Sequence, residues 1–265
     1  MIESRRPLRI AVVGAGVSGL SAAWLLSSAH DVVVYEAAPR LGGHANTRVV
    51  DVAGRRIAVD AGFIVYNELT YPNFVALLDH LDVASKPTDM SFAVSIDDGA
   101  LEYCGSGLAG LFAQRRNILN PRFLVMLRDL VRFYRTAVAE LPAHEHLSLD
   151  AFLDAGGYGR AFREDHLYPM AAAIWSTPAA NVGAFPAATF ISFCENHRLL
   201  SLGARPVWRT VEGGAFRYVD ALAQPLGAGL RLATAVVAAR RRPHGVELRD
   251  ATGGVDVFDH VVFAT

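Results

Sequence analysis

Three glycines after an apolar run are the residues of this chain whose spacing best suits chemistry. Gly14, Gly16 and Gly19 form a Gly-x-Gly-x-x-Gly turn between the run Arg9–Val13 and a helical pattern that begins near Ser18. In such a turn the first glycine permits a sharp bend, the second lets a diphosphate approach the backbone, and the third lets the helix pack closely on the strand. The pattern predicts a dinucleotide site at a helix N-terminus.

An acidic residue follows where this kind of site requires one. Glu36 ends a second β-branched run, Asp31–Tyr35, directly after the predicted helix. A carboxylate at this position can accept hydrogen bonds from both hydroxyls of a ribose, and it repels a 2′-phosphate. We therefore expect the site to favour FAD or NAD over NADP.

A second group of glycines lies close behind the acid. Arg40 precedes the pair Gly42 and Gly43. Paired glycines allow a backbone to approach phosphate closely, and an arginine can neutralise its charge. The alternative interpretation is an exposed glycine turn with a solvated arginine.

The segments GAGVSGLSAAWLL and YEAAPRLGGHANT resemble the FAD-binding N-terminus of the flavin amine oxidase and phytoene desaturase superfamily. Residues 59–67, 89–92, 169–176 and 208–214 extend the similarity to a bacterial subgroup of predicted NAD/FAD-binding oxidoreductases. The resemblance implies that Glu36 binds the adenosine ribose and that the segment from Arg40 to Gly43 wraps the diphosphate. It also implies that Gly62 and Phe63 run beside the isoalloxazine ring and that the backbone at Val236 holds the adenine.

These positions and their neighbours on the same turns form the predicted cofactor site, with FAD as the cofactor. Its members are Gly14, Gly16, Val17, Ser18, Gly19, Glu36, Ala37, Arg40, Gly42, Gly43, His44, Gly62, Phe63 and Val236.

Neither a catalytic residue nor a metal site follows from the sequence. The resembling family commonly has a lysine near the flavin, but Lys86, the single lysine of this chain, is not at a matching position. Tyr66, Trp175 and Trp208 are candidates for the wall of an apolar substrate pocket, although aromatic residues at such places are more often core. The His144–His146 segment is expected to be an exposed loop rather than a metal site.

Composition narrows the classes of protein further. The chain has 265 residues, 52% of them hydrophobic, and a formal net charge of −1, which gives no electrostatic case for binding nucleic acid. No apolar stretch approaches the ~18–20 residues of a transmembrane helix. Cys104 and Cys194 do not form a disulfide framework, so we expect a reducing, cytoplasmic compartment. The oligomeric state does not follow from the sequence.

Hydrophobic periodicity indicates the elements that hold these residues. We expect hairpins at 48–60 and 91–104 and helices at 71–81, from 121, at 149–154, 160–174, 187–197 and 216–222. Further strands are expected at 230–233, 235–240, 245–249 and 261–264, with Arg240–Arg242 at a hairpin tip. Because the middle of the chain is helical and both ends contain strands, we predict an α/β fold with an insertion. Residues 1–85 and 205–265 would form a Rossmann-like FAD/NAD(P)-binding domain, and residues 86–204 a mostly helical substrate (cap) domain.

The expected function is that of an FAD-dependent oxidoreductase. It would oxidise a C–H or C–N bond of a small, hydrophobic substrate by hydride transfer to the flavin. Because the sequence stops directly after an apolar strand and contains no Gly-Asp dipeptide of the kind that holds the flavin in the family, we expect a chain truncated at its C-terminus. A non-catalytic dinucleotide-binding fragment and an NAD-dependent dehydrogenase are the alternatives.

Overall fold

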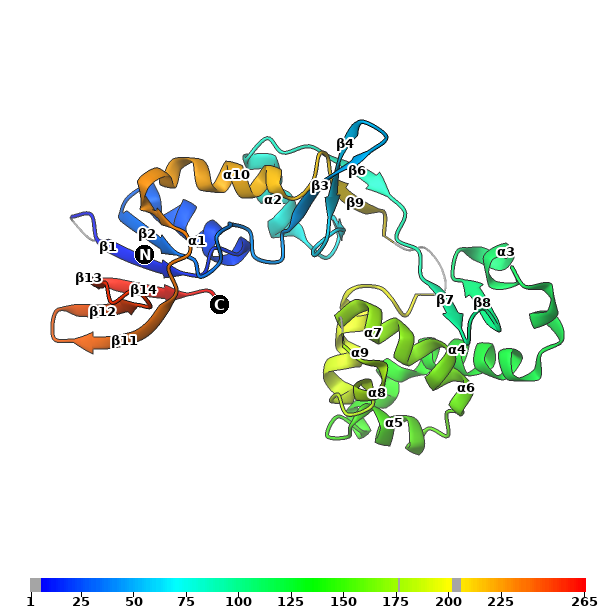
Figure 1. Ribbon diagram of the computed structural model, residues 1–265. Helices are drawn as coiled ribbons and strands as arrows, with labels where there is room; N and C mark the ends of the chain where they lie inside the picture. Colours follow the sequence, from blue (N-terminus) through cyan, green and yellow to red (C-terminus); the bar gives the residue numbers. More distant parts are fainter. Residues whose placement is uncertain (1–5, 176, 202–205) are drawn as a thin grey trace. The chain divides into compact units, whose positions relative to one another are not determined.

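The computed structural model describes residues 6–175, 177–201 and 206–265, and it divides the chain into two compact units (Figure 1). Unit 1 consists of residues 1–88 and 208–265, and unit 2 of residues 89–207. The sequence places the corresponding boundaries at 85 and 205, three residues earlier in each case. Unit 2 is therefore an insertion within unit 1.

A parallel sheet lies at the centre of unit 1. Its strands follow the order β10 (Leu230–Arg231), β2 (Asp31–Tyr35), β1 (Arg9–Val13) and β14 (His260–Phe263). All three neighbouring pairs are parallel, and Ala11 lies between Val33 and Val261. β-branched and apolar residues dominate β1 and β2 because a parallel sheet is covered on both faces.

Helices cover one face of this sheet. Val12 and Val34 pack there with Leu20 of α1 (Val17–Ser27) and Leu222 of α10 (Phe216–Ala223). Helix α1 joins β1 to β2, which gives the predicted strand–turn–helix–strand unit. The predicted α/β class is confirmed.

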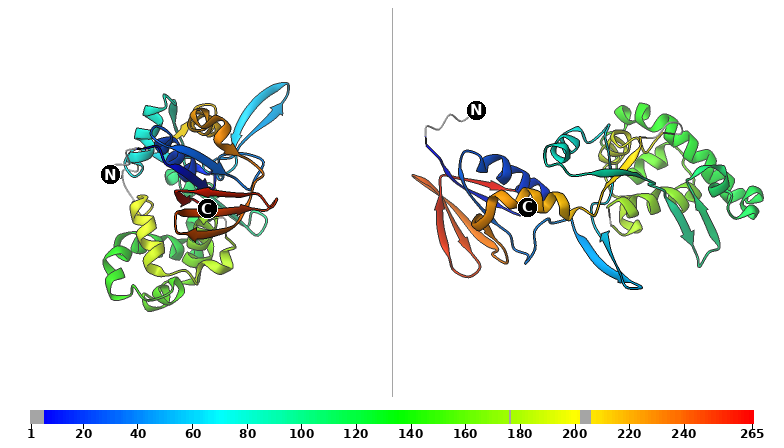
Figure 2. Two further views of the ribbon diagram at one scale, coloured as in Figure 1. Left: turned by 90° about the vertical axis from the view of Figure 1, so that its left-hand side faces the viewer. Right: turned by 90° about the horizontal axis from the view of Figure 1, so that it is seen from above.

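A three-stranded antiparallel meander covers the other face, as Figures 1 and 2 show in orange to red. It consists of β11 (Val236–Arg242), β12 (Gly245–Asp250) and β13 (Val255–Phe258). Tyr35 of the parallel sheet packs against Leu248 and Phe258 of the meander. Tyr35 and Phe258 meet edge to face, with ring centroids 6.0 Å apart.

The rest of unit 1 lies beyond the ends of β1 and β2. The hairpin β3–β4 is followed by helix α2 and by a small sheet in which β9 pairs with both β5 and β6. The bounds are β3 (Thr47–Val52), β4 (Arg55–Asp60), β5 (Tyr66–Asn67), α2 (Pro72–His80), β6 (Ser85–Thr88) and β9 (Trp208–Val211). The 3-10 helix Gln224–Gly229 instead connects α10 to β10 and packs against α1 and β2.

Unit 2 is mostly helical, with one hairpin. Helix α4 packs Phe133 against Phe152 and Phe162 in a core of its own, and Asn120 caps its N-terminus by accepting from Arg122 and Phe123. The elements are β7 (Ala93–Ile96), β8 (Leu101–Cys104), α3 (Gly107–Leu111), α4 (Pro121–Glu140), α5 (Leu149–Ala155), α6 (Arg160–Phe162), a π-helix (Arg163–Leu167), α7 (Tyr168–Trp175), α8 (Ala179–Val182) and α9 (Ala187–Asn196), with 3-10 helices at Arg115–Leu119 and Leu141–Ala143.

Most expected elements are present within a few residues, and the exceptions are instructive. The helix expected over 160–174 is interrupted by the π-helix. Arg240–Arg242 belong to strand β11 rather than to the hairpin tip. Strand β13 and the three-stranded sheet of β5, β6 and β9 were not expected, because their strands have only two to four residues each. Runs this short carry little periodicity.

Candidate dinucleotide-binding site

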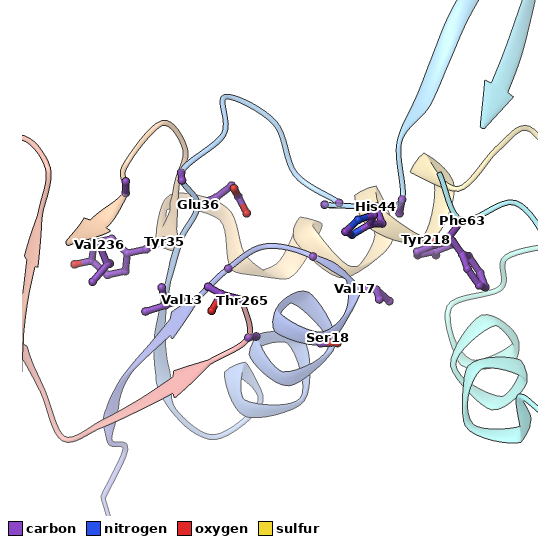
Figure 3. A pocket seen from close by; sticks show the side chains of 18 of the residues that line it. Val13, Val17, Ser18, Tyr35, Glu36, His44, Phe63, Tyr218, Val236 and Thr265 are labelled. Carbon is purple, nitrogen blue, oxygen red and sulfur yellow. The ribbon is translucent and has the colours of Figure 1, made fainter. Parts of the chain in front are cut away.

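A cavity of about 660 Å³ opens in unit 1 beside the N-terminus of α1 (Figure 3). Its volume falls within the ~300–1,000 Å³ typical of small-molecule and cofactor sites. In Figure 3, Tyr35 and Val236 lie near one end, and Phe63 and Tyr218 near the other. The lining residues are Val13, Gly14, Gly16, Val17, Ser18, Tyr35, Glu36, Ala37, Gly42, Gly43, His44, Ala45, Phe63, Tyr71, Phe74, Tyr218, Thr234, Ala235, Val236, Ala264 and Thr265.

Two glycines of the first motif are required by backbone packing. Gly14 has a φ of +102°, and a Cβ on it would lie 2.5 Å from the carbonyl oxygen of Ala264. A Cβ on Gly19 would lie only 1.8 Å from the carbonyl oxygen of Gly14, so the helix could not approach the turn. Gly19 does not line the cavity. Its contribution to the site is to bring the helix N-terminus to the end of β1.

Gly16 is different, because a Cβ there would meet nothing within 4 Å. It is the N-cap residue of α1, and it lines the cavity. The space that the missing side chain leaves lies where the unpaired N–H groups of the first helical turn and the positive end of the helix dipole favour an anion. This empty space fits a diphosphate.

The second pair of glycines lies against the first turn. Gly42 donates its N–H to the carbonyl oxygen of Ala15 over 2.8 Å and forms a bridge with Gly16. A Cβ on Gly43, whose φ is +57°, would lie 3.0 Å from the Cα of Gly16. The two glycine segments, twenty-odd residues apart in sequence, thus form one wall of backbone around the diphosphate position.

Glu36 lies at the end of β2 and braces the same turn. Its Oε2 accepts from the N–H of Ala15 over 2.7 Å, and its Oε1 accepts from the N–H of Ala38 over 2.8 Å. The side chain is half-buried and lines the cavity. Because a carboxylate has about four lone-pair positions, two remain for ribose hydroxyls. The residues present therefore fit the adenosine half of a dinucleotide.

Arg40 lies beside the glycine loop, and the contact with the diphosphate that the resemblance implies stays a prediction. It does not line the cavity; its Nη2 donates to the carbonyl oxygen of Gly43 over 2.9 Å and its Nη1 to that of Leu41 over 3.3 Å. In this structure the guanidinium ties together the ends of the glycine loop. These hydrogen bonds stabilise the loop conformation.

The backbone of His44 leaves no room for a side chain at Gly62. A Cβ on it would lie 2.1 Å from the carbonyl oxygen of His44, which accepts from the N–H of Phe63. His44 and Phe63 line the cavity, whereas Gly62 does not. The close approach at Gly62 is to the backbone of His44, and it positions both of these neighbours at the cavity.

Asp60 ties the hairpin β3–β4 to the N-terminus of α10. Its carboxylate accepts from the N–H of Ala215 over 3.0 and 3.1 Å and from the hydroxyl of Thr47, whose oxygen in turn accepts from the N–H of Phe216. An acceptor at the start of a helix satisfies its unpaired N–H groups, and a negative charge is favoured there. These contacts position α10, which carries Tyr218.

Aromatic side chains form the end of the cavity near α2 and α10. The ring of Phe74 meets those of Phe63 and Tyr218 edge to face, with centroids 5.6 and 5.3 Å apart, and Tyr71 packs on Phe63. Burial, with a smaller effect of nearby Asp60, raises the pKa of Tyr218 to about 12. Of these four residues, only Phe63 was predicted. Tyr71 and Phe74 were visible as part of a helical pattern, but no local signal placed them at the site.

The end of the cavity opposite the aromatic side chains is formed by the end of β2 and the segment that leads into the meander. Thr234, Ala235 and Val236 line the cavity beside Tyr35 and Glu36, and the N–H of Thr234 donates to the carbonyl oxygen of Glu36 over 2.8 Å. Val236 is therefore at the cavity, and the adenine-binding role that the resemblance implies for its backbone stays a prediction. Tyr35, Thr234 and Ala235 were missed because the fold, and not a motif, brings them there.

The three aromatic candidates for a substrate wall lie outside this cavity. Tyr66 is 3% exposed and its hydroxyl donates to Ser85, and Trp208 is 9% exposed. Trp175 packs against Phe190 and other aromatic residues in the core of unit 2. Among the described residues no cluster of three or more histidine, cysteine or acidic side chains could hold a metal ion. In the same residues, no helix combines the length and apolar character needed to cross a membrane.

A short segment of the chain is similar to L-amino-acid oxidases. An L-amino-acid oxidase of Demansia vestigiata is 50% identical over 46 residues, which are 17% of this chain and 9% of that protein. One from Sistrurus catenatus edwardsii is 55% identical over 48 residues, 18% of this chain and 9% of that protein. These relatives are similar only over a short segment, so they do not assign the function of the rest.

Two solved structures share the fold over nearly the whole chain. Cyclohexylamine oxidase from Brevibacterium oxydans matches with a TM-score of 0.68 at 20% identity. Putrescine oxidase bound to putrescine matches with a TM-score of 0.67 at 18% identity. Each match covers 98% of this chain but 58% of the other, so this chain spans little more than half the length of those proteins.

A family model extends the comparison beyond shared fold. The model described as flavin-containing amine oxidoreductase matches residues 17–265, which is most of the chain. This match confirms the resemblance stated from the glycine and acid motifs, and it confirms FAD as the predicted cofactor. The chain belongs to the flavin-containing amine oxidoreductase family.

Proposed function

We propose that this chain supplies the cofactor-binding part of an FAD-dependent oxidoreductase that oxidises a C–H or C–N bond of a small molecule. The observation that carries the proposal is the cavity wall where Gly16 and Gly42 lie side by side at the start of α1, with Glu36 beside them. That wall joins an anion site to a ribose-binding carboxylate in one continuous space.

Each part of the wall has a distinct task in this proposal. The N–H groups at the start of α1 bind the diphosphate, and Glu36 accepts hydrogen bonds from the ribose. The glycine loop, held by Arg40, excludes water from the diphosphate and leads the cofactor toward Phe63. When bound, the flavin supplies the acceptor for the hydride that leaves the substrate.

We propose an amine or amino acid as the first substrate class to test. The support is family membership together with the relatives, which are L-amino-acid, putrescine and cyclohexylamine oxidases. The aromatic end of the cavity, formed by Phe63, Phe74 and Tyr218, supports the narrower proposal of a substrate with an apolar part. Hydrophobic amines are therefore preferred over polyamines in a first screen.

Titration of the purified chain with FAD, NAD and NADP tests the cofactor assignment. We expect FAD to bind with quenching of its fluorescence, and Gly16→Val to abolish binding without unfolding the chain, because its side chain enters the space of the diphosphate. Glu36→Ala should weaken binding by at least ~10-fold, or about 1.4 kcal/mol. Binding of NAD alone would support a dehydrogenase instead. FAD binding without turnover of any amine in the screen, in this chain and in a longer polypeptide containing it, would support a non-catalytic binding module.

A further inference from the structure

A polar cluster connects the meander of unit 1 to the parallel sheet. Asp256 of β13 lies at its centre and is the acceptor for three side chains. Its Oδ2 accepts from the hydroxyl of Tyr35 over 2.9 Å and from Nη1 of Arg231 over 2.6 Å, and its Oδ1 accepts from Nη2 of Arg9 over 3.0 Å. The same Nη1 of Arg231 donates to the Tyr35 hydroxyl over 2.8 Å. The cluster therefore joins one meander strand to three strands of the parallel sheet.

The charges within the cluster favour this arrangement. Arg231 holds the pKa of Asp256 at about 2, and burial, followed by the hydrogen bond to Asp256, raises the pKa of Tyr35 to about 12. At neutral pH the cluster thus contains one carboxylate, two guanidinium groups and a neutral phenol. The guanidinium of Arg231 also lies 5.0 Å from the centre of the Tyr35 ring. Charge-assisted hydrogen bonds and cation–π contacts of this kind fix geometry as well as contributing energy.

The cluster adjoins the nucleotide end of the cavity, which one of its members, Tyr35, lines. Tyr35 precedes Glu36, and the carbonyl oxygen of Arg231 accepts from the N–H of Glu36 over 2.9 Å. On the meander side, β13 pairs with β12 and β12 with β11, whose first residue is Val236. The carboxylate of Asp256 is thus linked both to the cavity wall that carries Glu36 and, through the meander, to the wall that carries Val236, in addition to the direct bond from the N–H of Thr234 to the carbonyl oxygen of Glu36.

We propose that Asp256 is a positioning residue for the adenosine half of the cofactor, because it holds the wall at Val236 in register with Glu36. This inference rests on the proposed function, in which that cavity binds FAD. The residue does not line the cavity, so it acts through Tyr35, Arg231 and the meander strands.

The meander contains a natural control for this proposal. Arg242 and Glu247 form a bidentate ion pair between β11 and β12, with bonds of 2.8 to 3.1 Å. That pair links the two meander strands with each other and does not involve the parallel sheet. Removing it tests the meander's own stability, whereas removing Asp256 tests its connection to the sheet.

The experiment compares the dissociation constants of FAD and FMN for the wild-type chain, Asp256→Asn, Tyr35→Phe and Glu247→Gln. FMN lacks the adenosine, so it reports on the rest of the site. We expect Asp256→Asn to weaken FAD about 10-fold, or about 1.4 kcal/mol, and FMN less than about 2-fold, so that the ratio of the two dissociation constants changes by about 5-fold or more. Tyr35→Phe should change the same ratio by a smaller factor, and Glu247→Gln should leave it unchanged. Because Asp256 and Tyr35 belong to one cluster, the double variant Asp256→Asn/Tyr35→Phe should lose less FAD affinity than the sum of the losses in the two single variants.

Each outcome decides between a positioning and a merely structural role. An unchanged ratio of the FAD and FMN dissociation constants in Asp256→Asn would overturn the inference while leaving the proposed function standing. If Asp256→Asn does not fold, Tyr35→Phe decides in its place, because it removes one donor and keeps the ion pairs. A wild-type chain that binds neither flavin would overturn the proposed function, and this inference with it.

Discussion

The two ends of the cavity are built in opposite ways. Around the first turn of α1 the wall is backbone: Gly16, Gly42 and Gly43 contribute no side chains, and hydrogen bonds between main-chain atoms hold them together. At the other end the wall consists of aromatic side chains such as Phe74 and Tyr218, packed edge to face. A backbone wall tolerates added atoms only where its surface is open, as at Gly16, and not where main-chain atoms are in contact, as at Gly42, whereas a wall of side chains can be altered one side chain at a time. Substitutions at the two ends should therefore differ in kind.

The largest effect is expected at Gly19. Gly19→Ala forces a Cβ into the carbonyl of Gly14, and neither backbone segment can move without separating α1 from β1. We expect the free energy of unfolding to fall by about 3 kcal/mol or more in denaturant titrations. Gly16→Ala, only three residues away, is the matched control and should cost about 1 kcal/mol or less, since its Cβ meets open space. Equal stability of the two variants would contradict the close packing of Gly19 on the carbonyl of Gly14.

The next effect concerns the contacts that place the aromatic wall. Asp60→Ala removes the acceptor for the N–H of Ala215 and for the Thr47 hydroxyl, so α10 loses its cap. The expected loss is about 2 kcal/mol in thermal or chemical unfolding, within the range measured for helix N-caps. Asp60→Asn keeps an oxygen acceptor and should lose less than half as much. If Asp60→Asn loses more than half as much stability as Asp60→Ala, the negative charge contributes more than the hydrogen bonds.

A pH dependence should appear at the aromatic end. Because the folded pKa of Tyr218, about 12, lies above its ordinary value of 10.0, the unfolded chain releases this proton first as pH rises. The stability that this residue contributes is complete below pH 10.0 and is lost as the pH approaches 12. In the wild-type chain this should cost about 2 kcal/mol between pH 10.0 and about 12, and Tyr218→Phe should remove that part of the decline. An identical decline in the variant would place the titration elsewhere.

The smallest effect should come from Arg40, and it separates two roles. If the guanidinium acts by holding the carbonyls of Leu41 and Gly43, Arg40→Lys should weaken FAD about as much as Arg40→Met, by roughly 3- to 10-fold, because lysine lacks the planar fork. If it acts through its charge on the diphosphate, the lysine variant should retain most of the affinity. Dissociation constants measured at two salt concentrations distinguish the cases.

The contrast between the backbone wall and the aromatic wall also explains how much of the site could be predicted from the sequence. The Gly14–Gly19 turn and Glu36 lie within one local stretch and each has a geometric requirement, so residue types alone indicated the dinucleotide site. Tyr218 lies far along the chain from Phe74, and only the completed fold brings them together. The role of Arg40 depends on a side-chain conformation that no sequence pattern specifies. Fold class followed from strands and helices with clear periodicity, whereas the four-residue strand β13 had too little to detect.

Inserting the helical unit between the two segments of the cofactor unit has a consequence for synthesis on the ribosome. Strand β1 pairs with β14, and the N–H of Arg9 donates to the carboxylate of Asp259, 250 residues later. Residues 89–207 can fold as soon as they emerge, because their core is contiguous in sequence. The first 88 residues can pair β1 with β2, but the other edge of β1 stays unpaired and α10 cannot cover the sheet until residues 208–265 are translated. During that interval the nascent chain is most exposed to aggregation and most dependent on chaperones.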